Sequence, residues 1–449
     1  MSIPADKMET GNRQGPATPA DLGDMGKNPL SQEDPENNGM RVLVVGVGGA
    51  GTSIVLRTAE GSLLGVENIK FAVMDTNYRT SKIFHEKNFV KRLIIGKNLL
   101  HGHGCGMNPE LGEEAVLESK EEIVKIVQGA DCIIILNGDS GGTGTGAAPK
   151  IAEIAAQIEP EAFVLRISLN PFFEGQRKKF IVTECRNKEL KFFDDGDPSK
   201  KDALYNGVAV INNEGFIGAG KGVQEVREAV DDAMDNLFRA IYIALGIIGF
   251  PDIDVQDMKA TVTKTGRARI AYAKGGGDDR SDRIISELVS EKIFAGFEGY
   301  KPSACIVCIL VRESISDKLK MDELTSIIGG LEAYMTKASP SQIIQSVIDV
   351  PDGIGDVLLK DAEIGVLALF GNYISNEEEN RVLAEQANAA AQKNLIGNTG
   401  GNNIPPPATV PDPPIANQPP TPPDPSGENA DEENKRLFNA LSAGGLGQG

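Results

Sequence analysis

Short apolar runs alternate with amphipathic stretches through the first half of the chain. Strands are predicted where a run is continuously apolar: residues 41–47, 69–74, 93–95, 131–137, 162–169 and 207–211. Helices are predicted between these runs, among them residues 110–127 and 147–158. Continuous apolar strands separated by helices indicate a parallel sheet that is covered on both faces. This half is therefore predicted to be an α/β domain.

A long helix is predicted over residues 222–249, because apolar residues recur there at spacings of three and four. The second half repeats the mixed pattern, with a helix expected at 282–297 and strands at 304–311, 344–350 and 364–369. The expected parts are a disordered extension at 1–39, an α/β domain at 40–221, the long helix and an acidic loop at 222–257, a second α/β domain at 258–373, a polar helix at 374–394, a proline-rich linker at 395–430 and a terminal peptide at 431–449.

Composition narrows the classes of partner. The formal net charge is -19 and the pI is about 4.8, which argues against nonspecific nucleic-acid binding and against direct binding to anionic lipid. A bilayer-spanning apolar run and a signal peptide are both missing from the pattern, so a cytoplasmic protein without membrane insertion is expected. Five scattered cysteines fit reduced thiols, and Cys305 and Cys308 lie in an apolar strand, so no metal site made of side chains is expected.

The run Gly138–Gly146 is the strongest candidate for ligand chemistry. It follows an apolar strand and precedes a helix, and it alternates glycine with threonine. Bare backbone N–H groups at a helix N-terminus attract an anion, and threonine hydroxyls add donors. A turn that needs only flexibility is the plain alternative. The run is therefore predicted to bind phosphate groups.

A second glycine loop, Gly46–Gly51, has the spacing G-x-G-x-x-G, and Asp75 ends the next strand. Alone, this motif is typical of dinucleotide-binding folds, so an NAD-dependent oxidoreductase is a distant alternative. The loop Gly138–Gly146 argues against this alternative, because a dinucleotide-binding fold has no need of a second phosphate-binding loop at a later strand. The chain contains no G-x-x-x-x-G-K-[ST] motif, so a Walker-type loop is excluded.

The motif S-G-G-T-G-T-G at Ser140–Gly146 resembles the signature of the tubulin superfamily, closest to its FtsZ-like branch, and the likeness runs from about Arg41 to about Asn372. The resemblance implies a Rossmann-like GTPase domain, a central helix and a second α/β domain. It implies GTP or GDP as ligand, with Mg²⁺ bound through the phosphates. It also implies assembly with further copies of the chain into head-to-tail filaments.

The resemblance implies contacts to the nucleotide along the whole first domain. They are Gly48, Gly49, Ala50, Gly51, Ser53, Asp75, Gly104, Gly106, Asn108, Ser140, Gly141, Gly142, Thr143, Gly144, Thr145, Gly146, Glu174, Lys178, Asn213 and Asp232. Arg177 is an alternative to Lys178, and Asn212 an alternative to Asn213. Asp232 suits guanine, because a carboxylate accepts from both N1 and N2 of that base.

The loop Asp252–Asp257 resembles the family pattern Asn-x-Asp-x-x-Asp, which enters the nucleotide site of the next subunit. Asp254 and Asp257 match and are implied as catalytic residues that polarise a water behind the γ-phosphate, whereas Asp252 replaces the family's asparagine. A positioned base of this kind is typically worth about 10² to 10⁴ in rate. The expected enzyme is therefore a GTPase whose hydrolysis is coupled to polymerisation.

The cellular role is expected to be cell division. An accessory or cell-shape filament with weak GTPase activity is the alternative, because Ser53, the Met74-Asp75-Thr76 triplet, Asp252 and a shortened ribose loop at Phe172-Phe173 depart from the family pattern. Leu437 and Phe438 are predicted to dock on a protein anchor and to recruit the filament to the inner face of the membrane at the division site. A tail that merely spaces filaments is the competing interpretation.

Overall fold

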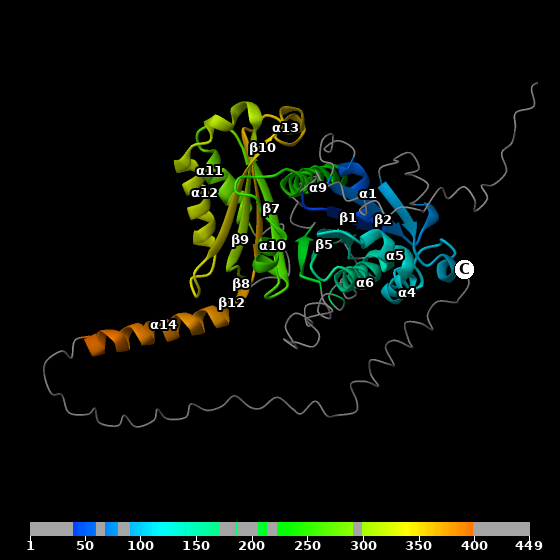
Figure 1. Ribbon diagram of the computed structural model, residues 1–449, viewed down its shortest axis with the longest axis horizontal. Helices are drawn as coiled ribbons and strands as arrows, with labels where there is room; N and C mark the ends of the chain where they lie inside the picture. Colours follow the sequence, from blue (N-terminus) through cyan, green and yellow to red (C-terminus); the bar gives the residue numbers. More distant parts are fainter. Residues whose placement is uncertain are drawn as a thin grey trace, which may run out of the picture. The chain divides into compact units, whose positions relative to one another are not determined.

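The structure is a computed structural model that describes residues 39–59, 68–79, 90–139, 141–170, 183, 185, 205–212, 222–290 and 299–397. The chain divides into two compact units, residues 1–388 and 389–449. All strands and nearly all helices belong to the first unit, and the described part of the second is the end of a helix. The fold is mixed α/β around one large sheet, as the sequence predicts (Figure 1).

The first half of the sheet is entirely parallel. Its strands follow the order β3-β2-β1-β4-β5-β6, and β1 pairs with β2 on one side and with β4 on the other. Their bounds are β1 (Val42–Val47), β2 (Ile69–Asp75), β3 (Val90–Ile94), β4 (Cys132–Gly138), β5 (Phe163–Asn170) and β6 (Gly207–Asn212). Because all these strands run the same way, their carboxyl ends meet at a single edge of the sheet.

Helices cover both faces of this half (Figure 1). One face packs against α1 (Gly48–Thr58) and α9 (Val223–Gly246), and the other packs against α4 (Pro109–Glu118), α5 (Lys120–Val127) and α6 (Gly142–Ile158). The short α3 (Lys97–Leu100) follows β3. The single helix predicted at 110–127 is wrong. Ser119 separates α4 from α5, and its Oγ accepts a hydrogen bond from Gly96 N at 3.0 Å.

The predicted long helix ends three residues early. Its last residue is Gly246, and Ile247 already has extended backbone angles. Phe250 then forms an isolated antiparallel bridge with Val347, through Phe250 N to Val347 O at 2.8 Å and Val347 N to Phe250 O at 3.1 Å. Backbone pairing to a strand therefore replaces the last turn that the apolar spacing predicted.

The second half extends the same sheet beyond β6 in the order β7-β11-β9-β10, with β11 antiparallel to both of its neighbours. The bounds are β7 (Arg267–Gly275), β9 (Ala304–Arg312), β10 (Gln342–Val350) and β11 (Ile364–Gly371). Only two residue pairs, Val208↔Arg267 and Ala209↔Ala268, join β6 to β7. The two halves thus share one sheet with a narrow seam, and the domain boundaries predicted from the sequence remain a prediction.

The helices of this half also lie on both faces. One core cluster contains residues of α11 (Arg280–Leu288) and α12 (Met321–Tyr334), and the other contains residues of α10 (Val255–Val262) and α13 (Asp352–Leu358). The remaining elements are η4 (Glu313–Lys318), the paired short strands β8 (Tyr300–Lys301) and β12 (Ile374–Ser375), and α14 (Asn376–Gly397). The helix predicted at 282–297 corresponds to α11, which ends at Leu288, and residues 291–298 lie outside the described residues.

Strand β7 was not predicted, because arginines interrupt its apolar pattern. Arg267 nevertheless lies over the ring of Tyr300 at 4.9 Å, and Arg269 donates to the Tyr334 hydroxyl at 2.7 Å. Both arginines are buried. Aromatic and carbonyl partners therefore let a charged sequence form a central strand. Cys305 and Cys308 lie on the same strand and face opposite core clusters, and burial raises the pKa of the Cys308 thiol to about 12.

The first turn of α14 is anchored by a buried carboxylate. Glu379 accepts hydrogen bonds from Thr336 Oγ1 at 2.8 Å and Lys337 N at 3.0 Å, and Lys301 Nζ lies 3.3 Å away. Burial by itself would raise the pKa of Glu379, but these hydrogen bonds and the Lys301 charge lower it below the ordinary 4.5. The ionised form therefore stabilises the fold above that pH, and this contribution is lost as the pH falls through the lowered pKa.

We therefore expect Glu379→Gln to lower the free energy of unfolding by about 1–3 kcal/mol at pH 7, because charged hydrogen bonds are removed. The difference from the parent chain should shrink in acid. Urea unfolding at pH 7 and near pH 4 measures both. The neighbouring exposed Glu378→Gln is the matched control and should have little effect. A penalty for Glu379→Gln that grows in acid would contradict this account.

Candidate functional site

Three loops meet at the carboxyl edge of the first half of the sheet. Two of them follow the neighbouring strands β1 and β4. The third, the glycine loop at 101–108, follows β3 and α3 and is joined to the end of β2 by Gly104 N to Thr76 O at 3.2 Å. The loops after β1 and β4 touch directly: a Cβ built on Gly48, whose φ is +68°, would lie 3.0 Å from Gly144 N. The glycine loops predicted from the sequence are thus parts of one surface.

Several of the predicted glycines serve backbone packing. A Cβ on Gly51 would lie 2.0 Å from Leu136 O, one on Gly144 would lie 2.4 Å from Gly138 O, and one on Gly146 would lie 1.8 Å from Pro109 O. Gly142 is enclosed in the same way by Cys105 and Asn108. Glycine at these four positions lets α1, α4 and α6 pack closely on the strand ends. Sequence spacing alone could not distinguish such packing glycines from glycines that contact a ligand.

Other predicted glycines face open space. No described atom lies within 4 Å of a Cβ built on Gly49, Gly106 or Gly141, and all three residues are exposed. Ala50 and Ser53 are exposed beside them on α1, and Gly104 is half-buried. Within the described residues, α1 and α6 begin with no side-chain cap and no acidic residue in the first turn. Two free helix N-termini therefore face the same edge, which favours an anion there.

The run Gly138–Gly146, here called the signature loop, contains two threonines whose hydroxyls have different surroundings. Thr143 Oγ1 shares a hydrogen bond with Thr76 Oγ1 at 2.6 Å, and Cys105 Sγ lies 3.5 Å from each of these oxygens. Thr145 is 4% exposed, and its hydroxyl has no hydrogen-bond partner in the described structure. Thr76 and Cys105 thus tie the Gly138–Gly146 loop to the end of β2 and to the glycine loop at 101–108. Neither was predicted as a site residue, although Thr76 stands where the sequence departs from the family pattern.

Asp75 and Asn108 both organise loop backbone. Asp75 is buried, and its Oδ1 accepts from Thr76 N at 2.7 Å and Asn77 N at 3.3 Å. Asn108 is the N-cap of α4, where its Oδ1 accepts from Glu110 N at 2.9 Å. Asn is a favoured cap residue, and Pro109 suits the first helical position. Both residues lie at the predicted edge and shape the loops there.

Behind the signature loop lies a buried ion pair that sequence reasoning missed. Arg166 on β5 donates from Nη1 to Asn137 Oδ1 at 2.8 Å and to Asp139 Oδ1 at 3.1 Å. Asn137 Nδ2 donates to the same Asp139 oxygen at 2.8 Å. The Arg166 and Asp139 side chains are 2% and 6% exposed. A single arginine in the run F-V-L-R-I-S-L was the available signal.

The start of α9 lies alongside α1. Arg57 of α1 forms ion pairs with Asp231 (Nη1 to Oδ1, 3.1 Å) and with Asp235. Ser53 lies one turn before Arg57 on the same face of α1. The ion pairs therefore bring Asp231, and with it the exposed Asp232 that is predicted to contact the base, to the same flank of α1 as Ser53.

The acidic loop lies at the other edge of the sheet. Asp254 is the N-cap of α10 and forms a reciprocal capping box with Asp257: Asp257 N to Asp254 Oδ1 is 2.8 Å and Asp254 N to Asp257 Oδ2 is 3.2 Å. In the last turn of α10, Lys259 Nζ reaches Pro160 O, just before β5 begins, at 3.3 Å. The eight residues of β5 span roughly 23 Å at about 3.3 Å per residue, so both aspartates lie far from the glycine loops.

Four predicted contacts, Ser140, Glu174, Lys178 and Asn213, lie outside the described residues, as do Arg177, Leu437 and Phe438. Asn212, the alternative to Asn213, ends β6 at the carboxyl edge. Among the described residues, no group of His, Cys, Asp or Glu is arranged to hold a metal ion. No helix in the described ranges is long and apolar enough to cross a membrane.

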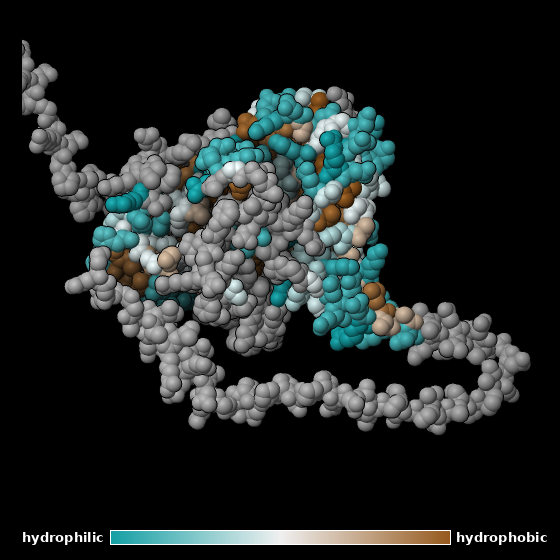
Figure 2. All heavy atoms as spheres, turned by 180° about the vertical axis from the view of Figure 1, so that it is seen from behind, coloured by the Kyte–Doolittle hydropathy of each residue, from teal (hydrophilic) through white to brown (hydrophobic). Residues whose placement is uncertain are grey.

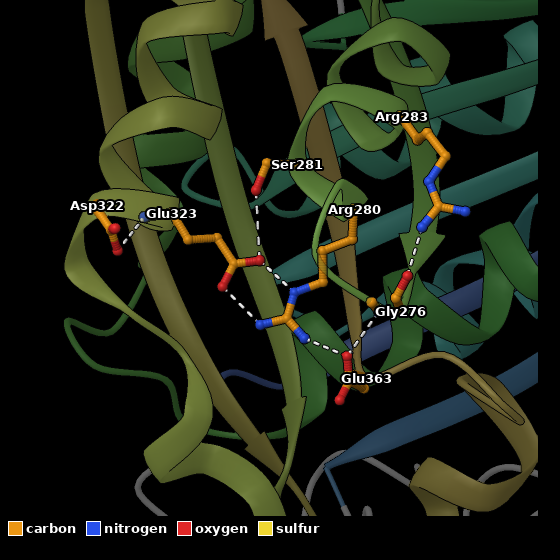
Figure 3. A network of polar contacts seen from close by, with 8 residues as sticks. Gly276, Arg280, Ser281, Arg283, Asp322, Glu323 and Glu363 are labelled. Atoms are coloured by element: carbon orange, nitrogen blue, oxygen red, sulfur yellow. Dashed lines mark hydrogen bonds and ion pairs between the residues drawn. The ribbon is translucent and has the colours of Figure 1, made fainter.

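A second polar region lies at the end of β7. Arg280 donates from Nη2 to Glu323 Oε2 and from Nη1 to Glu363 Oε2, both at 2.6 Å, and Figure 3 shows it between the two carboxylates. An open groove of about 650 Å³ runs beside it, lined in part by Lys274 and Lys360. Burial and the Lys360 charge lower the pKa of Lys274, whose ammonium donates to Leu358 O at 2.6 Å.

Known proteins share this architecture. The solved FtsZ dimer of M. jannaschii matches 75% of this chain and 89% of its own, with a TM-score of 0.61 and 23% identity. The GTPγS-bound protofilament of CetZ2 from Haloferax volcanii matches 79% of this chain and all of its own, with a TM-score of 0.57 and 19% identity. At these identities the likeness establishes the fold alone.

Sequence comparison relates part of the chain to a known family. The mitochondrial division protein fszB of Dictyostelium discoideum is 29% identical over 258 residues, which is 56% of this chain and 66% of the relative, just under two thirds of its length. The model of the Tubulin/FtsZ family, GTPase domain, matches residues 41–191, which contain all three glycine loops. Residues 41–191 therefore match the GTPase domain of the Tubulin/FtsZ family.

Proposed function

We propose that this protein binds and hydrolyses GTP and assembles head to tail into filaments in which each subunit completes the site of its neighbour. The observation that carries the proposal is the separation of two halves of a site. Open glycine loops and two free helix N-termini lie at one edge of the sheet, and Asp254 and Asp257 lie at the opposite edge. A subunit cannot bring its own carboxylates to its own phosphates, whereas a stacked copy can.

The nucleotide is held mainly by backbone in this proposal. Gly49, Gly106 and Gly141 leave room for phosphate oxygens close to main-chain N–H groups, while the Thr143 hydroxyl holds Thr76 instead. Mg²⁺ would be bound through the phosphates. Asp232 would accept from guanine N1 and N2, which excludes adenine, and Glu174 and Lys178 would contact the ribose.

Exposed apolar side chains support stacking of these two surfaces. Tyr78, Leu99 and Met107 are exposed around the glycine loops, and Ile248 and Phe250 are exposed on the segment that leads to the acidic loop. Different surfaces that meet in a heterologous contact build an open filament. Among the coloured residues in the view of Figure 2, hydrophobic ones form small separate groups between hydrophilic ones.

The proposal is tested by giving purified protein GTP, GDP, ATP or NAD and imaging each sample by electron microscopy. We expect tight guanine-nucleotide binding, and filaments with GTP. Tight NAD binding without guanine nucleotide would overturn it in favour of an oxidoreductase.

Phe250 is the residue we expect assembly to need most. The residue is 87% exposed, although its backbone is fixed by two hydrogen bonds to Val347. Phe250→Ala should abolish filaments and polymerisation-coupled turnover and leave GTP affinity unchanged. Met321, 75% exposed at the start of α12, supplies the control Met321→Ala. Sedimentation with GTP measures both variants, and equal pelleting of the two would contradict the assignment.

We further propose a role in division, which the name of the relative fszB supports. In this proposal Leu437 and Phe438 dock on a protein anchor at the cytoplasmic face of the membrane. An accessory filament with weak GTPase activity is the second candidate, favoured by Asp252, which adds a carboxylate to the acidic loop.

A further inference from the structure

The buried pair of Arg166 and Asp139 is costly to keep. Two ions out of water lose hydration, and replacing such a pair by well-packed apolar residues is often neutral or stabilising. Here the pair sits within a parallel sheet beside buried Asn137, with both side chains of the pair at most 6% exposed. Fold stability is therefore a weak reason for its presence, and its location suggests another.

Asp139 lies between the end of β4 and the start of α6 at Gly142. Its N–H donates to Leu169 O at 3.0 Å, and its carboxylate receives Arg166 and Asn137, so side chain and main chain are both held. The helix start beside it is where phosphate groups would bind. Without Arg166, the buried Asp139 carboxylate would repel phosphate groups strongly, because charges interact more strongly where water is excluded.

We propose that Arg166 is a positioning residue for the nucleotide. Its guanidinium holds Asp139 and Asn137, and thereby the entry to the signature loop, and it cancels a negative charge directly behind the bound phosphates. The inference rests on the proposed function, since it needs a phosphate ligand at this loop. Arg166 itself does not reach the ligand, because it is 2% exposed beneath the loop.

The test measures affinities of Arg166→Met, Arg166→Lys and the double variant Arg166→Met with Asp139→Asn for GMP, GDP and GTP. For Arg166→Met we expect GTP affinity to fall roughly ten-fold or more, with a smaller loss for GDP and the smallest for GMP, because repulsion grows with ligand charge. Arg166→Lys should bind better than Arg166→Met. The double variant should return to within about three-fold of the parent, because removing the carboxylate removes the repulsion.

A matched control is Arg280→Met, which breaks the buried pair of Arg280 and Glu323 in Figure 3. It should lower stability and leave all three affinities unchanged. If Arg166→Met does not fold, the double variant still decides, since a folded double variant with poor GTP affinity contradicts the proposal. A parent chain that binds no GTP overturns the proposed function as well. A parent that binds GTP while Arg166→Met binds it equally well overturns this inference alone.

Discussion

Asp254→Asn should lower GTP turnover by roughly two to four orders of magnitude while GTP binding persists. Asparagine caps a helix about as well as aspartate, so α10 keeps its N-cap and only the charge is lost. Alanine at the same position would also remove the cap, at a cost of about 1 kcal/mol, and would confuse stability with chemistry. Asp257→Asn should behave similarly. Phosphate release measures turnover, and GTP affinity and filament mass are measured on the same samples. A change in chemistry is thereby separated from a change in binding or in assembly.

A mixing experiment tests whether the acids act on the neighbouring subunit. Gly49→Asp should fold, because no described atom crowds that position and a carboxylate suits a helix start. The same carboxylate takes the place of a phosphate, so this variant should bind no GTP. When the two variants are mixed, the Gly49→Asp subunit supplies an intact acidic loop, and the Asp254→Asn subunit supplies an intact nucleotide site. Turnover of the mixture well above that of either variant is expected, and turnover no greater than their sum would exclude catalysis between subunits.

The second large effect is expected at Gly51. A methyl group there would lie 2.0 Å from Leu136 O, so α1 must move away from β4. Overpacking of this kind costs about 1–3 kcal/mol, and the displaced helix start should weaken GTP binding roughly ten-fold or more. Gly49→Ala, two residues away in open space, is the matched control, and we expect its free energy of unfolding to stay within about 1 kcal/mol of the parent. Thermal unfolding and nucleotide titration measure both variants. A Gly49→Ala variant as unstable as Gly51→Ala would contradict the packing assignment.

Sequence pattern predicted the α/β class, the parallel strands and the loops that meet at their carboxyl ends, because continuous apolar runs and glycine spacing are local signals. It could not separate Gly51, which packs, from Gly49, which is open, because that distinction depends on which strand lies behind each residue. It missed β7, since Arg267 and Arg269 are accommodated by aromatic and hydroxyl partners distant in sequence. The contact between Thr76 and Thr143 and the pair of Arg166 and Asp139 were missed for the same reason.

The opposite placement of glycine loops and acids determines how many complete sites a filament contains. In the proposed stack, a filament of n subunits contains n − 1 complete sites, because one terminal subunit offers its loops to no neighbour. A dimer then has one complete site for two chains, and long filaments approach one complete site per chain. The two ends also differ chemically, since one end keeps a nucleotide that no carboxylate reaches. Filament length, rather than protein concentration itself, would then set the turnover of each molecule.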